Sequence, residues 1–424
     1  MHYIIIGLGS AGDVHPNVGL GVALRKRGHR VTLVAASVFR DLAAQAGLEF
    51  FGLGKDEDHY DAIRNPDLWD PMKAFPLVAR LLMLPAIQPI YDFIAQNYVA
   101  GETVVAAPAT AFGARIAQEK LGVPLASVHL QPSMLRSVLD PPTYMLPDIL
   151  RPLPKWLRQL YFRAVDRFLI DKLLGPETNA FRAKLSLPPV RSFFGAWLHS
   201  PQLVIGLFPD WFAPAPADWP VNFHHAGFPL WDESDVRPPS AELQEFLAAG
   251  EPPYVFTAGS AMMHGHEFFD EAVGVCVKTG RRGILIAKYA EQIPPSLPPA
   301  VRHFDYVPFS QVLPRAAAFV HHGGIGTTAQ AFAAGVPQVA TPLAHDQFDN
   351  AMRIRKSGCG DFLLPKQFKR DRAAALLERL RTSPQVRAAC EARADALRVA
   401  QPIVRACDLL ESLAQPARAS AAGN

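Results

Sequence analysis

The chain has 424 residues, of which 49% are hydrophobic and 19% are charged, so we expect two domains with large buried cores. A formal net charge of +3 is too weak a bias to indicate nucleic-acid binding, which concentrates Lys and Arg on one face. The four cysteines, at positions 276, 359, 390 and 407, have neither metal-ligand spacing nor the pattern of a disulfide framework, which suits a reducing cytoplasm.

In the first half of the chain, short β-branched runs alternate with longer helical patterns. The runs are HYIIIGL, HRVTLVA, ETVVAA and VPLASVHL. This alternation predicts a parallel sheet with crossover helices. The first run has no basic residues before it, so it is a strand candidate and not a signal peptide. No run approaches the roughly 18 apolar residues of a membrane-spanning helix, which predicts a soluble or peripheral protein.

The first strand candidate ends in the loop GLGSAGDVHP. Gly7, Gly9 and Gly12 spell the dinucleotide fingerprint GxGxxG, which taken alone predicts a nicotinamide or flavin enzyme. The second strand candidate, however, ends at residues 34–37 without the Asp or Glu that binds a ribose hydroxyl. A diphosphate on these glycines would also lie beside the carboxylate of Asp13, which repels it. An NAD(P)-binding oxidoreductase is therefore a distant alternative.

Asp13 is our candidate for a catalytic base. An acid on a tight turn at the carboxyl end of a strand faces the crevice in which doubly wound proteins bind ligands. The alternative is a helix N-cap, a common role of Asp that stabilises a helix by about 1 kcal/mol. His15 and His29 are also acid–base candidates, although lone histidines near a turn are more often surface or structural groups.

Two leucine-rich and aromatic helical segments, residues 71–98 and 144–174, interrupt the strand pattern of the first unit. In the second segment, basic side chains line one side of an apolar helix pattern: Lys155, Arg158, Arg163, Arg167 and Lys172. One interpretation is a helix packed on its own domain with a solvated basic face. The other is a surface that touches an anionic membrane or a fatty ligand.

A polar, proline-rich stretch at residues 231–253 precedes a second series of strand candidates. The series PYVFTAGS, RGILIAK, VRHFDYV, AAFVHHGG and PQVATPL predicts a second doubly wound unit. We expect an N-terminal domain at 1–225, a linker at 226–250, a C-terminal domain at 251–395, and a helix with a frayed tail at 396–424. The last amphipathic pattern runs from about residue 387 to residue 413.

A second glycine-rich loop, HHGGIGTT, follows the strand candidate AAFV. Gly323, Gly324 and Gly326 free the backbone where a helix begins, and bare amides at a helix N-terminus bind phosphate. The loop lacks the Lys of a Walker loop, so amides, hydroxyls and His321 or His322 must meet the phosphate charge. We therefore predict a diphosphate site here.

Further polar residues follow strand candidates of the second unit. Ser260 ends the run PYVFTAGS and can donate to the same phosphate oxygens. The stretch LAHDQFDN provides Asp346, Gln347, Asp349 and Asn350, whose side chains are of the kind that bind sugar hydroxyls. Together the three loops predict a cradle for a nucleotide sugar.

The segment HHGGIGTT, followed by AGVPQ and HDQ, resembles the donor-binding signature of the family 1 GT-B glycosyltransferases, and the resemblance covers nearly the whole chain. It implies two doubly wound, Rossmann-like α/β domains that face each other across a cleft. The first domain would bind the acceptor and the second the nucleotide sugar. In GDVHP, Asp13 stands at the position of the family's base, where some branches have His. An inverting transfer is implied, with Asp13 removing the proton of the acceptor hydroxyl.

The resemblance also implies which residues bind the donor. Tyr306 would stack on the nucleobase, Val307 would read its edge, His322 would contact the diphosphate, and Asp346 and Gln347 would hold the sugar. The full set implied is Gly12, Ser260, Tyr306, Val307, His322, Gly323, Gly324, Gly326, Thr327, Asp346 and Gln347.

The resemblance implies a donor and an acceptor as well. Gln330 stands where many uridine-sugar enzymes of the family carry a Glu for both ribose hydroxyls, which is compatible with a thymidine donor. GSAGDVHP, NPDLWDP, FPDWFAPAPADWP and AHDQFDN resemble the branch that builds rhamnolipids. That branch implies transfer of L-rhamnose from dTDP-L-rhamnose to a lipid hydroxy acid, a 3-(3-hydroxyalkanoyloxy)alkanoic acid, and peripheral contact with the inner membrane. The alternative is a polyketide, sterol or other small aglycone that receives a dTDP- or UDP-sugar.

We expect no metal and no cofactor besides the nucleotide-sugar co-substrate. Amides, a helix dipole and an imidazole can meet the diphosphate charge. The DxD string Asp56–Asp58 lies in the polar loop GKDEDHYD and not between a strand and a glycine loop, so we interpret it as solvated surface.

Overall fold

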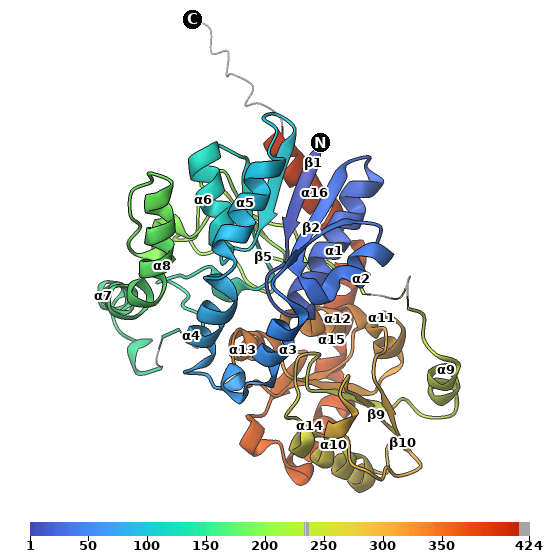
Figure 1. Ribbon diagram of the computed structural model, residues 1–424. Coiled ribbons are helices and arrows are strands. Elements are labelled where there is room, and N and C mark those ends of the chain that lie inside the picture. Colours follow the sequence, from blue (N-terminus) through green and yellow to red (C-terminus); the bar gives the residue numbers. More distant parts are fainter. Residues whose placement is uncertain (144, 147, 233, 235–236, 415–424) are drawn as a thin grey trace, which may run out of the picture.

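The structure is a computed structural model that describes residues 1–143, 145–146, 148–232, 234 and 237–414. Two parallel sheets, each with helices around it, form two units, one above the other in Figure 1. The predicted fold class of two doubly wound α/β units is confirmed.

The first sheet has seven strands in the order β3-β2-β1-β4-β5-β6-β7, all paired in parallel. In β1 the side chains of Tyr3 and Ile5 enter the core on one face of the sheet, and Ile4 and Ile6 enter the core on the other. A strand buried on both faces needs an unbroken apolar run, which explains the sequence HYIII. The strands are β1 (His2–Ile6), β2 (Arg30–Ala36), β3 (Glu49–Leu53), β4 (Thr103–Ala107), β5 (Leu125–His129), β6 (Leu203–Gly206) and β7 (Phe223–His225).

The second sheet has six strands in the order β10-β9-β8-β11-β12-β13, again all parallel. Its two cores are divided in the same way, with Tyr254 and Phe256 of β8 on one face and Val255 on the other. The strands are β8 (Tyr254–Thr257), β9 (Gly283–Ile286), β10 (Val301–Phe304), β11 (Ala318–His321), β12 (Gln338–Ala340) and β13 (Gly360–Phe362).

Helices connect the strands of both units. Those of the first unit are α1 (Ala11–Lys26), α2 (Arg40–Gln45), α3 (Asp56–Arg64), α4 (Ala74–Val78), α5 (Ile87–Asn97), α6 (Phe112–Leu121), α7 (Lys155–Val165) and α8 (Asp171–Lys184), with the short turns η1 (Ser37–Phe39), η2 (Pro66–Trp69), η3 (Ala79–Met83), η4 (Pro132–Met134), η5 (Asp148–Leu150), η6 (Asp166–Ile170) and η7 (Phe193–Trp197). From the linker onward they are α9 (Ala241–Ala248), α10 (His266–Thr279), α11 (Phe309–Val312), α12 (Ile325–Ala334), α13 (Gln347–Lys356), α14 (Arg370–Thr382), α15 (Pro384–Val399) and α16 (Pro402–Ala414), with η9 (Ala290–Gln292), η10 (Leu313–Arg315) and η11 (Pro365–Gln367).

The segment at 71–98 is helical as predicted, through α4, η3 and α5. Within the described residues, 74–97 is the one helix long and apolar enough to cross a membrane by length and composition. Ile87, Ile90 and Ile94 nevertheless pack into the core of the first sheet, and α5 lies against α6, where a Cβ on Gly113 would meet the carbonyl of Ile87. This burial is typical of a core helix.

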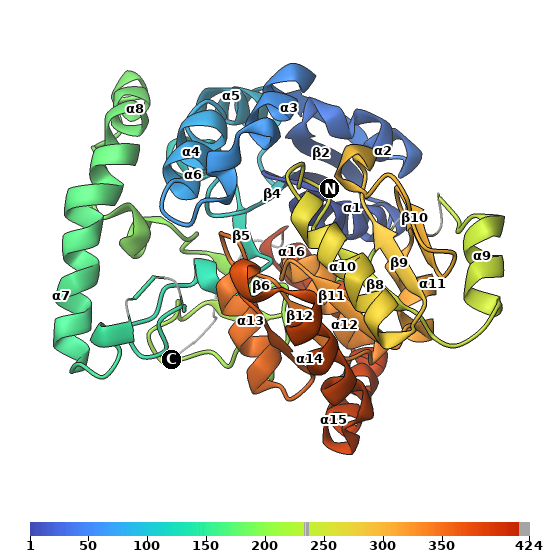
Figure 2. The same ribbon diagram turned by 90° about the horizontal axis from the view of Figure 1, so that it is seen from below.

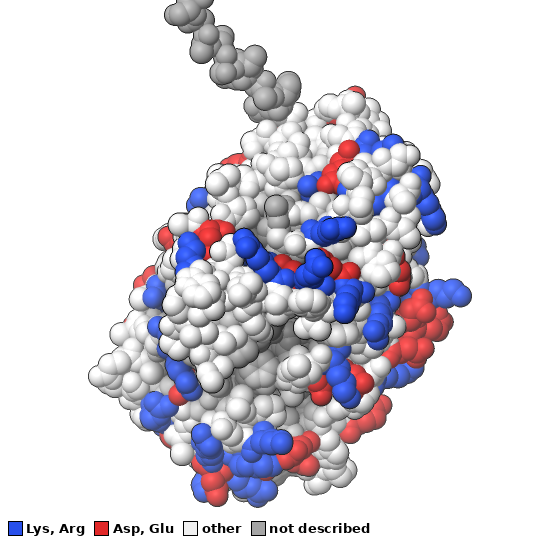
Figure 3. Space-filling model, turned by 90° about the vertical axis from the view of Figure 1, so that its left-hand side faces the viewer, with Lys and Arg blue, Asp and Glu red and all other residues white. Residues whose placement is uncertain are grey.

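The second segment forms an arm of α7, η6 and α8, which stands at the edge of the molecule in Figure 2. Lys and Arg side chains form a band on the face where α7 and α8 lie (Figure 3). Trp156 and Leu160 of α7 are 64% and 57% exposed, whereas Leu174 of α8 is fully buried in the core. The arm is therefore packed into the core through α8, whereas α7 exposes apolar side chains to solvent. Residue 144, the predicted start of this segment, lies outside the described residues.

The last amphipathic pattern forms two helices, because Pro402 disfavours a helical conformation at the residue before it and α15 ends at Val399. α15 packs on α12 of the second unit, and α16 crosses back to α1 and β4 of the first (Figure 1). Arg27 of α1 holds Asp408 and Glu411 of α16, each at 2.7 Å. The predicted frayed tail at 415–424 lies outside the described residues.

Candidate active site

One cavity of about 2040 Å³ lies between the two sheets, and residues of both units line it. Ligand pockets ordinarily measure roughly 300–1,000 Å³, so this cavity has room for two substrates. The loops after β1, β4 and β5 reach it from the first unit, and those after β8, β11 and β12 from the second. All residues of the predicted donor set except Gly323 line it.

Asp13 lies in the first turn of α1 and lines the cavity. Its Oδ2 accepts hydrogen bonds from the backbone N–H of Ser10 at 2.8 Å and from the Ser10 hydroxyl at 3.2 Å. Ser10 is the N-cap, so Asp13 is the third helical residue of a capping box and not the N-cap itself. Burial raises the pKa of Asp13. A carboxylate with one oxygen fixed and a raised pKa suits a general base.

The first glycine loop does not leave a place for a dinucleotide phosphate. Gly9 has φ +141°, and a Cβ on it would lie 2.2 Å from Oδ2 of Asp13. The carboxylate thus fills the space over the loop and takes the Ser10 amide that a phosphate would need. The interpretation of GxGxxG as a nicotinamide or flavin fingerprint is therefore wrong.

The other two histidines near this loop differ in position. His15 lines the cavity with its ring edge toward Trp231, the ring centroids being 5.7 Å apart. His29 instead bonds Glu411 of α16 at 2.8 Å. As an acid–base candidate His29 is therefore wrong, because its ring ties α16 to the first unit.

The structure separates the two histidines of the second glycine loop. His321 is fully buried: one ring nitrogen bonds Gln338 at 2.9 Å, and the other accepts from the N–H of Gly323 at 3.1 Å. His321 therefore shapes the loop from below. His322 lines the cavity, and its Nδ1 has no hydrogen-bond partner among the described residues. Burial, followed by the nearby charge of His345, lowers the pKa of His322 to about 4, so its imidazole is neutral at physiological pH.

The ring of His322 fits between two glycines that cannot be replaced without moving it. A Cβ on Gly324 would lie 2.4 Å from Nε2 of His322, and a Cβ on Gly259, where φ is +101°, would lie 3.0 Å from its Cε1. Gly326, at the start of α12, faces the carbonyl of Gly12 at 4.0 Å from a built Cβ. The N-termini of α12 and α1 thus meet across the cleft, and the unpaired amides at the start of α12 can bind an anion there.

We expect Gly324→Ala to weaken donor binding by tenfold or more, because the new methyl group displaces the His322 ring. The backbone is not the cause, since Gly324 has an ordinary extended conformation with φ −62°. The measurement is the dissociation constant for dTDP by calorimetry. The double variant Gly324→Ala, His322→Ala is the control: if the methyl group acts through the ring, the two losses do not add. Additive losses would contradict this explanation.

Asp346 and Gln347 line the donor side of the cavity. Burial, followed by the negative charge of Asp13, raises the pKa of Asp346 to about 7. The two carboxylates therefore face each other closely enough to interact, one from each unit. The side-chain carbonyl of Gln347 accepts from the amides of Leu343 and Ala344, which leaves its NH₂ group toward the cavity.

Asp349 and Asn350 do not belong to the lining, contrary to the prediction that they bind sugar hydroxyls. Asp349 is buried in an ion pair with Arg353 at 2.7 Å. Asn350 donates to the carbonyl of Gly323 at 2.9 Å and to Asp346 at 2.6 Å. Because α13 turns these side chains inward, Asn350 holds the glycine loop and Asp346 in a fixed relation.

The predicted nucleobase pocket lies at the far end of the donor side. Tyr306 and Val307 follow β10, and Gln330 of α12 lines the same cavity. The guanidinium of Arg237 lies over the ring of Tyr306, 4.4 Å from its centroid, and pairs with Asp305 at 2.8 Å. One face of the ring therefore carries a cation, so the predicted stacking of a base would need the other face or the displacement of Arg237.

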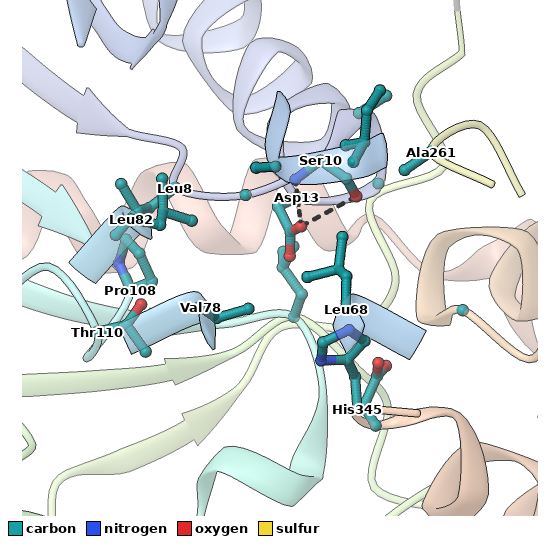
Figure 4. A pocket seen from close by; sticks show the side chains of 18 of the residues that line it. Leu8, Ser10, Asp13, Leu68, Val78, Leu82, Pro108, Thr110, Ala261 and His345 are labelled. Atoms are coloured by element: carbon teal, nitrogen blue, oxygen red, sulfur yellow. Dashed lines mark hydrogen bonds between the residues drawn. The ribbon is translucent and has the colours of Figure 1, made fainter. Parts of the chain in front are cut away.

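The acceptor side of the cavity is apolar. Figure 4 shows Leu8, Val78, Leu82 and Pro108 around the space beside Asp13. His345 reaches this space from the second unit, with φ +59°, a left-handed conformation that is uncommon outside glycine. Its ring lies edge-on to Trp69, and its pKa is lowered by burial. The sequence carried no pattern that singled out His345 for this contact between the units.

No group of three or more His, Cys, Asp or Glu side chains is placed to hold a metal within the part of the chain that the structure describes. In the DxD string, Asp58 accepts the backbone N–H of Lys55 at 3.0 Å and caps α3. Metal independence stays a prediction.

Comparisons with known proteins agree with this geometry. Residues 3–140 match the glycosyltransferase family 28 N-terminal domain, and residues 283–410 match the erythromycin biosynthesis protein CIII-like C-terminal domain. O-mycaminosyltylonolide 6-deoxyallosyltransferase of Streptomyces fradiae is 32% identical over 98% of this chain and 98% of its own. A sterol 3-beta-glucosyltransferase of Arabidopsis thaliana is 26% identical over 85% of this chain and 60% of its own. The crystal structure of glycosyltransferase VinC in complex with dTDP superposes with a TM-score of 0.69 at 19% identity, covering 98% of this chain and 99% of its own.

Proposed function

The chain belongs to the family 1 GT-B glycosyltransferases, and from that premise we propose that it transfers a sugar from a dTDP-sugar to a hydroxyl group of an apolar aglycone. The observation that carries the proposal is the pairing of Asp13 with the loop of His322 across one cavity that has room for a donor and an acceptor. The transfer is an inverting displacement.

In this reaction the acceptor oxygen attacks the anomeric carbon, and the bond from that carbon to the diphosphate breaks. Asp13 takes the proton of the acceptor hydroxyl as the new bond forms. The amides at the start of α12 and the imidazole of His322 take up the negative charge that grows on the leaving diphosphate. Asp346 and Gln347 orient the sugar between these two groups. No bound metal is part of this proposal.

A thymidine donor is supported by Gln330, which replaces the Glu expected for two ribose hydroxyls, and by the dTDP in the VinC structure. L-rhamnose remains one candidate sugar. The 6-deoxyallosyl group in the name of the Streptomyces relative favours 6-deoxyhexoses as a class.

For the acceptor we propose a polyketide, sterol or similar aglycone in place of the hydroxyacyloxy acid. The relatives named above carry macrolide and sterol acceptors in their names, which supports the broader class. The apolar lining beside Asp13 suits either acceptor. The exposed Trp156 of the arm, on a face that carries many Lys and Arg side chains, suits a membrane surface. Membrane contact and cytoplasmic location stay predictions.

The proposal is tested by mass spectrometry after incubating the purified chain with dTDP-L-rhamnose or UDP-glucose. The acceptor panel contains a macrolactone aglycone, a 3β-hydroxysteroid and a 3-(3-hydroxyalkanoyloxy)alkanoic acid. We expect a glycosylated macrolactone or steroid with the dTDP donor. An adduct of the hydroxy acid alone would restore the lipid interpretation, and an adduct with UDP-glucose alone would contradict the thymidine donor.

A further inference from the structure

A cluster of polar side chains lies in the acceptor part of the cavity, away from Asp13. It consists of His129, Ser133, Arg136, Asp166 and His199, which we call the distal cluster. His129, Ser133 and Arg136 line the cavity. The lining around them is mostly apolar, with Phe162, Val165, Leu169 and Phe194, and it also includes Lys172 of α8. Polar groups that converge in an apolar pocket are those that orient a ligand.

The charges of the distal cluster cancel. Arg136 donates to both oxygens of Asp166, at 2.6 and 2.7 Å, and Asp166 is only 3% exposed. His129 bonds His199 through ring nitrogens 3.1 Å apart. Burial, followed by the charge of Arg136, lowers the pKa of His199 to about 4, and burial lowers the pKa of His129 as well. A carboxylate brought here would add an unbalanced charge to a buried site, which is costly.

The cluster still has hydrogen-bonding capacity. His129 uses one ring nitrogen for His199, and its Nδ1 makes no hydrogen bond among the described residues. The Oγ of Ser133 is buried and likewise has no partner within that part of the chain. Buried polar groups without partners are rare in folded proteins, because each one costs free energy. A ligand oxygen within reach of either group would satisfy it.

The sheet sets the sideways spacing between the strands that lead to this cluster and to the reacting centre. Asp13 lies in the first turn of α1, beyond the end of β1, and His129 is the last residue of β5. β4 alone separates β1 from β5, so these strands are two strand spacings apart. With neighbouring strands about 4.8 Å apart, the sideways spacing is about 10 Å.

We propose that the distal cluster binds an uncharged oxygen of the acceptor, a carbonyl or hydroxyl, displaced sideways by about 10 Å from the hydroxyl that attacks the sugar. This inference rests on the proposed function and narrows the class of acceptor molecules that it includes. The acceptor is a rigid, multi-ring or macrocyclic aglycone with oxygen functions at both ends, and not a fatty acid bound by its carboxylate.

The test uses two steroids that differ only at the distal end. Epiandrosterone has a 3β-hydroxyl and a 17-ketone, and 5α-androstan-3β-ol lacks the ketone. With dTDP-L-rhamnose or the donor found active, we expect kcat/KM to be about fivefold to tenfold higher for the ketone, the worth of one or two neutral hydrogen bonds. In Ser133→Ala and in His129→Leu this preference decreases, and in the double variant it disappears, because the ketone loses first one partner and then both.

His129→Gln is the matched control, because its amide can bond both His199 and the ketone, and it should restore part of the preference. Ser133→Ala removes a buried hydroxyl without a partner and should not unfold the protein. In Ser133→Ala and in His129→Leu, the rate of donor hydrolysis in the absence of acceptor stays unchanged. A preference that is equal in wild type and variants, or absent in the wild type, overturns the inference. If the wild type glycosylates neither steroid, the inference also fails, whereas the proposed function is decided by the wider acceptor panel.

Discussion

The Asp13→Asn variant should lose about 10²- to 10⁴-fold in kcat, the usual contribution of a general base. Asn has nearly the same shape and can still accept the hydrogen bond from the Ser10 amide, so the capping box of α1 survives. The dissociation constant for dTDP should change little, because the diphosphate is proposed to bind at the α12 loop. Steady-state kinetics with a saturating donor, together with calorimetry for dTDP, measure the two effects separately.

The wild-type pH profile provides a second check on Asp13. A base acts only when deprotonated, and burial raises the pKa of Asp13 above its ordinary value. The rate should therefore fall as the pH is lowered, and this fall should begin above the range in which an exposed Asp titrates. The titration of Asp346 affects the rate in the same pH range, since its pKa is about 7. A rate that stays constant down to the range of an exposed Asp would argue against Asp13 as the base.

Folding provides the control for this substitution. The folded-state pKa of Asp13 is raised, so the folded protein binds a proton more readily than the unfolded chain, and stability decreases as the pH rises above the unfolded pKa. Asp13→Asn removes the buried charge, so its melting temperature at pH 8 should equal or exceed that of the wild type. A lower melting temperature would mean that the loss of rate reflects damage to the fold.

The fold could be predicted from the sequence because its strands are buried on both faces. In the run HYIII the residues after His2 are aliphatic or aromatic, because Tyr3 and Ile5 pack on one side and Ile4 on the other. The loops after these strands could be predicted as well, since parallel strands bring their carboxyl ends to one edge of the sheet. Asp13 was predicted in this way, as was His321 or His322, and the family resemblance then singled out His322.

The roles of single polar residues in the loops could not be predicted with the same success. Asp349 and Asn350 stand beside Asp346 in the sequence, yet α13 turns them into the interior, where they bond Arg353 and Gly323. Gly9 matches a phosphate-binding pattern, yet the Asp13 carboxylate occupies the space above it. In both cases the orientation of the helix after the loop determines which side chains reach the cavity. The orientation of a helix about its own axis cannot be predicted from a short residue pattern.

The acceptor was the least predictable feature for a related reason. The residues that line its part of the cavity come from η4, η6 and η7 and from the loops around them, far apart in the sequence. The five basic side chains of the arm suggested a lipid partner, but of these five only Lys172 is among the described residues that line the cavity, and Arg136, which also lines it, is paired with Asp166. Charge along a helix therefore says little about charge inside the pocket beneath it.

His322→Ala should lower kcat by about 10²- to 10³-fold, the effect of removing one donor from a site that stabilises developing charge. With its pKa lowered to about 4, the imidazole is neutral over the working pH range, so it acts as a hydrogen-bond donor and not as a cation. His322→Gln keeps an N–H donor and should recover part of the rate. If His322 acted as a cation, the neutral Gln would not restore any of the rate.

The His322→Ala variant also distinguishes a catalytic role of His322 from a structural one. Its Nδ1 has no partner among the described residues, and its ring lies between Gly259 and Gly324, so Ala leaves no broken hydrogen bond behind at Nδ1. The melting temperature should therefore remain close to that of the wild type. Because the charge on the diphosphate grows as the sugar leaves, kcat should fall more than dTDP affinity. An unchanged kcat would remove His322 from the mechanism and leave the amides of α12 as the stabilising groups.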